Sequence, residues 1–314
     1  MDLGATLTTS ELEASSEAVK VSANLSHTRL ACCSRDNSVS TYAFEGAGWR
    51  QLTSWDLPDG IGVKAVWAHP EYGAVLAVLT DTGVATLFSE DLQCGQTRMQ
   101  PDASFSEQDV TALSFAPKEM GLQLALVSRR GRVRVYNAAS SSAANNWVLQ
   151  TEFEGISLSE CTSICWRSYS QALPPMMLLG TKDGAQVFWY NGQVMSWELA
   201  AKLGNEAVSD VAWASTANGH DEYIASAQGT KVVLWQLKGY ADKVQAELVA
   251  ALDHKSHVCQ VEWNAVGTWL AVATAEGGVN LWRPNLGGEW CCQSKIEPQQ
   301  QNADYVMVGS EISS

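Results

Sequence analysis

The stretch HVCQVEWNAVGTWLAVATAEGGVNLWRPNLGGEWCCQSKI, residues 257–296, contains four short apolar runs separated by turn residues. Glu276-Gly277-Gly278 and the segment 284–288 are two of these turns, and both are short enough to join neighbouring antiparallel strands. The stretch therefore predicts one four-stranded antiparallel sheet. Such a sheet cannot bury both of its faces alone, so it needs similar sheets on either side.

Two sequence markers recur along the chain at the spacing of such a sheet. The first closes the third strand at positions 42, 87, 136, 188, 235 and 282, which are 45, 49, 52, 47 and 47 residues apart. The second closes the first strand with an aromatic residue, at Trp67, Phe115, Trp166, Trp213 and Trp263. A period of about 40–50 residues with four strands per unit is typical of a β-propeller. A β-sandwich of many short strands, the alternative, gives no reason for this period.

We therefore predict an all-β fold, a six-bladed β-propeller in which each blade is a four-stranded antiparallel sheet. The predicted blades span about 17–57, 61–100, 109–153, 160–200, 207–252 and 257–296. Residues 1–16 are small, polar and acidic, which indicates a mobile leader. Residues 297–314 are predicted to be a flexible tail, in which the YVMV run at 305–308 is compatible with a short strand.

The charge of the chain favours protein partners over nucleic acid. The 314 residues carry a formal net charge of −14, whereas binding to a phosphate backbone relies on clustered Lys and Arg. The densest basic cluster is Arg129, Arg130, Arg132 and Arg134. A solvated strand face explains this cluster more simply than a nucleic-acid patch does, so we expect no direct nucleic-acid binding.

The cysteines and the hydropathy pattern bear on the compartment. None of the eight cysteines forms a C-x-x-C pair or a zinc-type spacing, and most fall in predicted strands, which suits a reducing compartment. We expect no signal segment, and no run approaches the roughly 18 apolar residues of a membrane helix. A membrane would be reached only indirectly, through an assembly.

The residues that could support catalysis are better explained by structure. His254-x-x-His257 has no third metal ligand nearby, and His69 is expected to stabilise a turn. The acidic residues at predicted hairpin turns are Asp36, Asp81, Asp183 and Glu276. No nucleophile elbow, phosphate loop or dinucleotide fingerprint is present. We predict no catalytic residue, no metal and no cofactor, with an enzyme centred on the propeller channel as the alternative.

The strand count suggests how the ring ends. A closed propeller usually completes its last blade with a strand from the opposite end of the chain, but residues 257–296 supply all four strands themselves. We therefore predict an open or weakly latched ring, whose exposed edges accept strands of a partner by β-augmentation. A ring closed by face packing alone is the alternative.

Several stretches resemble the Seh-type nucleoporins, WD-repeat proteins related to the Sec-thirteen coat protein. They are WAHPEYGAVLA (67–77), VTALSFAPKEMGLQLA (110–125) with GRVRVY (131–136), and SHVCQVEWNAVGTWLA (256–271) with GGVNLWRPNLGGEW (277–290). The resemblance covers about residues 17–296, although the Trp-Asp dipeptide of WD repeats is absent. The FAPKEMGL stretch and the RPN…W close favour the Seh type over its coat relative.

The resemblance implies an open six-bladed propeller that acts as a scaffold in the Y-shaped outer-ring complex of the nuclear pore. A helical scaffold nucleoporin would donate a blade between the first blade and the last, beside other subunits of that complex. By position, the docking residues would be Val19, Val21 and Ala23 on blade one, and Val258 and Val261 on blade six. The expected location is the nuclear envelope, where the complex supports transport of protein and mRNA.

Three other hypotheses about function remain at this point. The first is a Sec-thirteen-type subunit of a vesicle coat. The second is a subunit of a TORC-regulating complex of amino-acid signalling, which would place the chain in the cytoplasm or at the lysosome. The third is a general WD-repeat adaptor that grips a peptide.

Overall fold

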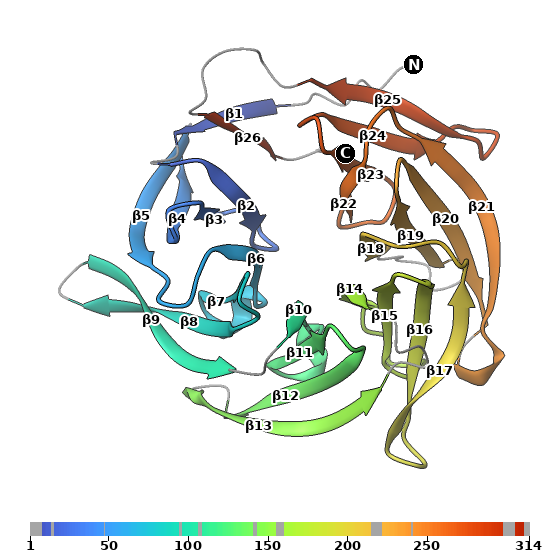
Figure 1. Ribbon diagram of the computed structural model, residues 1–314, viewed down its shortest axis with the longest axis horizontal. Coiled ribbons are helices and arrows are strands. Elements are labelled where there is room, and N and C mark those ends of the chain that lie inside the picture. The colour runs from blue at the N-terminus through green and yellow to red at the C-terminus, as the bar shows by residue number, and fades with distance from the viewer. Residues whose placement is uncertain are drawn as a thin grey trace. The chain divides into compact units, whose positions relative to one another are not determined.

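A computed structural model describes most of the chain as β-strands. The described residues are 8–13, 16–46, 48–93, 96–105, 109–140, 143–154, 160–214, 222–239, 241–297 and 305–310. They form six four-stranded sheets and one two-stranded sheet (Figure 1). The six four-stranded sheets are the blades of a β-propeller, which confirms the predicted fold class. The chain divides into two compact units, residues 1–124 with 136–148 and 300–314, and residues 125–135 with 149–299.

The first unit contains the first two blades. Blade one pairs its strands in chain order: β2 (Ala18–Ala23), β3 (Arg29–Ser34), β4 (Ser38–Glu45) and β5 (Gly48–Asp56). Blade two does the same with β6 (Gly62–Trp67), β7 (Val75–Thr80), β8 (Ala85–Gln93) and β9 (Gln96–Phe105). Two short 3-10 helices, η1 (Pro70–Tyr72) and η2 (Lys118–Met120), belong to the same unit.

Blade three divides its strands between the two units. Its order is β10 (Val110–Phe115), β11 (Gln123–Ser128), β12 (Arg132–Ser140) and β13 (Ala143–Glu154).

The second unit contains blades four to six. Blade four comprises β14 (Cys161–Trp166), β15 (Met176–Thr181), β16 (Gly184–Asn191) and β17 (Ser196–Leu203). Blade five comprises β18 (Asp210–Trp213), β19 (Glu222–Gln228), β20 (Lys231–Lys238) and β21 (Gln245–Asp253), with the 3-10 helix η3 (Ala241–Lys243) between its last two strands. Blade six comprises β22 (Val258–Trp263), β23 (Leu270–Thr274), β24 (Val279–Pro284) and β25 (Trp290–Ile296).

The two sequence markers lie in one row across each sheet. In blade five, Trp213 pairs with Ile224, which pairs with Trp235. The register between β20 and β21 shifts directly before Trp235, where Val249 is the extra residue of a β-bulge in β21. Blade six repeats the row with Trp263, Leu270 and Trp282.

In blade two Phe88, and not Leu87, is the third-strand marker. Phe88 pairs with Leu76, which pairs with Trp67. The position predicted from the sequence, 87, was therefore one residue too early at this blade.

The marker row defines two faces of every blade. We call the face that carries the row the leading face; in the core between blades one and two, the leading face of blade two packs against blade one. The opposite face of blade one, which contributes Ala31, Cys33 and Val39 to that core, is its trailing face. All three side chains are buried. The apolar trailing face of blade one thus meets the apolar leading face of blade two.

The two ends of the chain pair with each other outside the blades. Strand β1 (Thr8–Glu13) runs antiparallel to β26 (Tyr305–Ser310), in the segments predicted as leader and tail. Residues 305–308, which the sequence made compatible with a short strand, lie in β26. Apart from residues 16 and 297, the rest of those two segments lies outside the described residues. In the described chain, neither β1 nor β26 joins the sheet of blade one or blade six.

Candidate functional site: the end faces of the first and last blades

The contact between blades five and six is made by two apolar sheet faces. Blade five contributes its trailing face, five aliphatic side chains that are each at most 3% exposed: Ala225, Ala227, Val232, Leu234 and Leu252. Blade six covers them with its leading face, which includes Val258, Val261, Leu270 and Val272. Removal of this apolar surface from water is what holds the two sheets together.

The trailing face of blade six repeats the docking face of blade five. The strand registers make its members equivalent, position by position, to the five residues of blade five: Ala271, Ala273, Val279, Leu281 and Ile296. The residue types are the same except that Ile296 replaces Leu252. Leu281 is 6% exposed, whereas the other four are only partly buried. Blade six therefore repeats this aliphatic pattern on its trailing face, where four of the five residues are partly exposed and not fully buried as in blade five.

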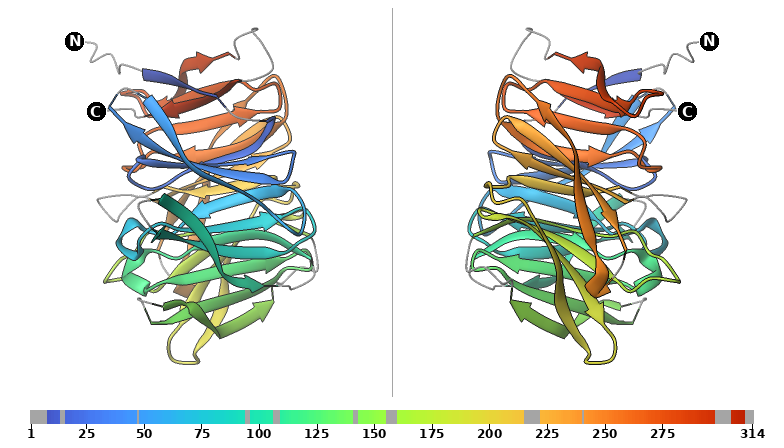
Figure 2. Two further views of the ribbon diagram at one scale, coloured as in Figure 1. Left: turned by 90° about the vertical axis from the view of Figure 1, so that its left-hand side faces the viewer. Right: turned by 90° about the vertical axis from the view of Figure 1, so that its right-hand side faces the viewer.

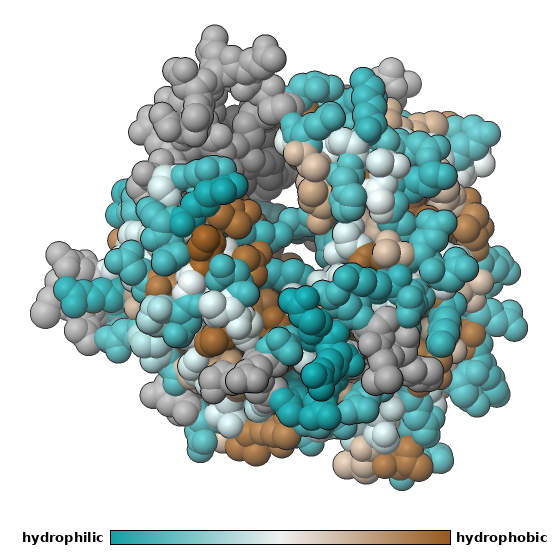
Figure 3. Space-filling view, viewed as in Figure 1, coloured by the Kyte–Doolittle hydropathy of each residue, from teal (hydrophilic) through white to brown (hydrophobic). Residues whose placement is uncertain are grey.

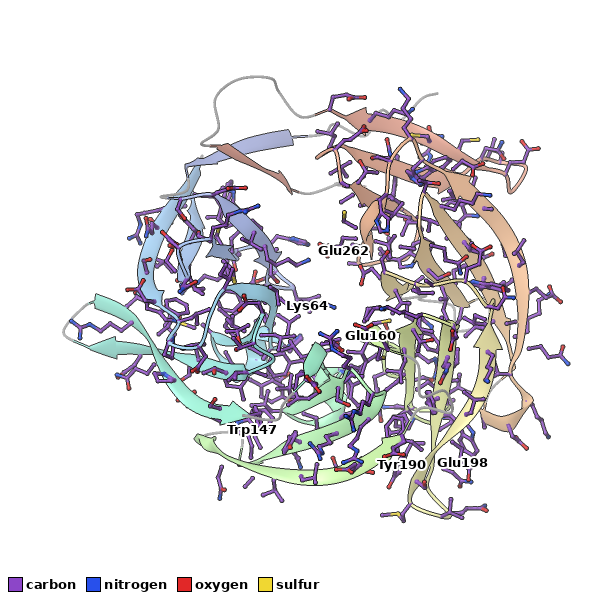
Figure 4. All side chains as sticks on the ribbon, in the orientation of Figure 1. Lys64, Trp147, Glu160, Tyr190, Glu198 and Glu262 are labelled. Atoms are coloured by element: carbon purple, nitrogen blue, oxygen red, sulfur yellow. The ribbon has the colours of Figure 1, made fainter. Side chains whose placement is uncertain are left out.

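Two equivalent hydrogen bonds join the first strands of neighbouring blades. Trp263 Nε1 of blade six donates to the carbonyl of Ala212 in blade five, at 3.3 Å. Trp67 Nε1 of blade two donates in the same way to the carbonyl of Ser22 in blade one, at 3.1 Å. In blade six the equivalent of Ala212 is Glu262, an exposed residue on the inner strand (Figure 4). Any sheet that followed blade six in this geometry would meet this carboxylate.

The leading face of blade one is the other end face. Its buried members are Leu30, Cys32 and Tyr42, and Val21 packs partly buried against them. Burial raises the pKa of the Cys32 thiol and of the Tyr42 hydroxyl, so both groups stay neutral near pH 7. At the first-strand marker position stands Ala23, which is exposed and has no indole to donate to a neighbouring sheet.

The residues predicted to dock a partner fall on different surfaces. Val21 lies on the leading face of blade one, and Ala23 is exposed at the end of the same strand. Val19 is 41% exposed and sits where the first strand is irregular. Val258 and Val261, at 0% and 4% exposure, are packed against blade five. Their side chains are thus already occupied, and the open face of blade six is built from the alternate residues.

The arginine-rich strand of blade three is electrically balanced. Arg132 pairs with Glu154 at 2.9 Å and Arg134 with Glu152 at 2.5 Å, both from strand β12 to strand β13. Arg129 pairs with Glu160 at 2.8 Å. These ion pairs favour the solvated-face interpretation over a phosphate-binding patch. The surface shown in Figure 3 is mostly polar, with separate apolar groups.

Asp36 and His69 stabilise turns through hydrogen bonds to backbone groups, as the sequence predicted. Asp36 Oδ1 accepts hydrogen bonds from the Ser38 backbone N–H at 3.0 Å and from its hydroxyl at 2.6 Å, which lowers the pKa of that carboxyl. His69 Nδ1 accepts from the Glu71 backbone N–H at 3.2 Å, at the start of η1.

His254 belongs to the packing of blade six. Its Nε2 accepts a hydrogen bond from Trp282 Nε1 at 3.2 Å, which fixes the ring against blade six. Among the described residues, no three His, Cys, Asp or Glu side chains are grouped so that they could hold a metal ion. The seven cysteines in the described ranges are free thiols, and no helix there is long and apolar enough to cross a membrane.

The environment of His254 leads to a prediction about pH. Burial lowers the pKa of this imidazole, and backbone hydrogen bonds and Asp253 offset the effect only in part. Because the unfolded chain then binds the proton more readily, stability should fall as pH drops below about 6.5, the ordinary value for histidine. His254→Asn should lose this pH dependence of stability, which is measured as the change in Tm between pH 7.5 and 5.5. The exposed His257→Asn is the control, and equal slopes for wild type and His254→Asn would contradict the assignment.

Six repeated four-stranded antiparallel sheets define a β-propeller, the fold of the WD-repeat proteins. No family model matches the chain. It is 32% identical to nucleoporin SEH1 of Bos taurus and of Homo sapiens, over 91% of this chain and 89% of each relative. Nucleoporin SEH1-A of Xenopus laevis is also 32% identical, over 84% of this chain and 81% of the relative.

The chain therefore belongs to the SEH1 nucleoporin family. The fold also matches a solved structure of a protein from Lactobacillus plantarum, with a TM-score of 0.70 over 95% of this chain and 90% of that one. Because the two are only 11% identical in sequence, this match supports the fold alone.

Proposed function

We propose that this protein is a non-enzymatic scaffold of the nuclear pore, located at the nuclear envelope, that accepts a blade from a helical scaffold nucleoporin. The donated blade docks between the first and the last blade and anchors the propeller in the Y-shaped outer-ring complex. Through that complex the protein supports nucleocytoplasmic transport. Membership of the SEH1 family supports the nucleoporin role.

The observation that carries the blade-accepting role is the trailing face of blade six. It presents the same aliphatic pattern that blade five uses to hold blade six, and four of its five residues are partly exposed. Apolar surface that is patterned for a sheet and left open is an association site. An incoming blade would cover this face, and its own opposite face would need an apolar partner such as the leading face of blade one around Val21.

The test is to purify the tagged protein from its own cells and identify the main partner that remains bound at high salt. A stable complex with a helical nucleoporin, together with fluorescence of the tagged protein at the nuclear rim, is the expected result. The interface should be mainly apolar and bury more than about 2,000 Å², as obligate interfaces do. A vesicle-coat subunit, a TORC-regulating complex or a set of unrelated peptides as main partner would contradict the proposal.

A further inference from the structure

The two ends of the chain form a sheet of their own on one side of blade one. Six residue pairs join β1 to β26, from Thr8 with Ser310 to Glu13 with Tyr305. Strand β1 lies against β5, the last strand of blade one, without joining its sheet. The pair is on the side of blade one away from blade two, as Figure 1 shows and Figure 2 agrees.

That side of blade one is where a preceding blade would dock. Blade two covers the trailing face of blade one, so the side away from blade two carries the leading face around Leu30 and Val21. Only four residues separate Glu13 from Ala18, the first residue of blade one. At about 3.3–3.6 Å per residue, β1 stays within roughly 18 Å of the start of β2. The pair is therefore tethered beside the end face of blade one.

The sheet formed by β1 and β26 has low stability of its own. A two-stranded sheet is only marginally stable in water because it has little apolar surface to bury. Strand β1 reads TTSELE, with Leu12 as its single large apolar residue, whereas β26 reads YVMVGS. Each strand also has one edge outside the pair. A partner sheet with more apolar strands would replace it at small cost.

We propose that the β1–β26 pair is a placeholder that occupies the end face of blade one until the donated blade displaces it. This inference rests on the proposed function. The pair lowers the affinity for the partner, because only molecules with the pair released can accept the donated blade. If the pair is formed in nine molecules out of ten, the apparent Kd rises about tenfold.

A disulfide across the pair tests this directly. Ser10 and Val308 face each other in the register, so the variant Ser10→Cys/Val308→Cys can be locked by oxidation. The probe is the recombinant helical nucleoporin identified by the co-purification described above, titrated by isothermal calorimetry. We expect the oxidised form to bind at least tenfold more weakly than the same protein after reduction. Ser10→Cys alone, given the same treatments, is the control and should bind equally in both.

A second variant ends the chain at Ile296 and so removes β26. It should fold like the full chain and bind the same nucleoporin about tenfold more tightly. Equal binding by the oxidised and reduced forms, failure of the disulfide to form, or weaker binding by the shortened chain would each overturn the placeholder while leaving the proposed function intact. Absence of binding by every form, the wild type included, would overturn both.

Discussion

Val279→Asp should leave the protein folded and greatly weaken binding of the donated blade, whereas the same change at Val232 should strongly destabilise the fold. The two valines occupy equivalent register positions, Val279 between Ala273 and Ile296 in blade six and Val232 between Ala227 and Leu252 in blade five. Val232 is 0% exposed in the core between blades five and six, and Val279 is partly exposed.

The two substitutions put the same charge into different surroundings. An aspartate at position 232 would be buried without a partner charge, at a cost of about 3–5 kcal/mol. At position 279 the carboxylate keeps contact with water, so the cost in the free protein should be near 1 kcal/mol. It becomes buried only when a sheet covers the face. We therefore expect a loss of about 2–5 kcal/mol in binding, on the order of 30- to 5,000-fold in Kd.

Thermal melting and co-purification with the helical nucleoporin would measure the two effects. Leu248→Asp is the matched control, because Leu248 lies on the outer strand of blade five and is 61% exposed. It should change neither folding nor binding. Val279→Asp protein that still co-purifies with the partner at the wild-type level would show that the trailing face of blade six is not the docking face.

The repeated sheets could be predicted from the sequence because their cores reuse residue types at nearly constant spacing. Trp213 and Trp263 close equivalent first strands, and both follow from alternation and turn residues alone. The end of β9 was less predictable: the strand continues to Phe105, where the sequence suggested an end near 100. Outer strands have few buried residues, so little in the sequence marks where they stop.

Which face of blade six would dock a partner is hard to predict from the sequence, because both faces of a blade are apolar. Alternation places Val258 and Val261 on one face, but it cannot say whether that face meets the previous blade or the next one. Comparing residues at equivalent register positions in two blades helps to distinguish the two faces. The row that begins with Ala212 in blade five begins with Glu262 in blade six, and this charged residue distinguishes the face of blade six from the equivalent covered face of blade five.

The pairing of β1 with β26 could hardly be predicted from the sequence. The strands lie at opposite ends of the chain, and β1 is a polar segment without strand alternation. Only the short apolar run of β26 predicted a strand, and nothing in the sequence of either segment indicated which strand it would pair with. Val19, Val21 and Ala23, by contrast, could be predicted to lie in a first strand, because their strand is bounded by a turn and repeats the position of β6.

Glu222→Gln should destabilise the protein by about 3–5 kcal/mol, although it lies far in sequence from either end face. Glu222 begins β19 in blade five and pairs with Arg167, which directly follows β14 in blade four. Arg167 Nε donates to both carboxylate oxygens, at 2.7 and 2.9 Å. Trp213 Nε1 donates to one of the same oxygens at 3.0 Å. The side chains of Arg167 and Glu222 are only 6% and 14% exposed.

The expected cost comes from the charge that is left behind. With glutamine at position 222, the Arg167 guanidinium stays buried and has lost its counter-ion, which costs more than the pair itself contributed. The double variant Arg167→Met/Glu222→Gln removes both charges and keeps an acceptor for the Trp213 indole. It should therefore recover much of the stability that the single variant loses.

Urea denaturation of the four combinations gives the coupling between the two residues. Glu247→Gln is the control, because the Lys238–Glu247 pair on blade five is about half exposed and should contribute less than about 1 kcal/mol. Blade six rests on blade five, so loosening the contact between blades four and five should also reduce the temperature at which the partner stays bound. A Glu222→Gln variant as stable as Glu247→Gln would mean that this buried ion pair does not hold blades four and five together.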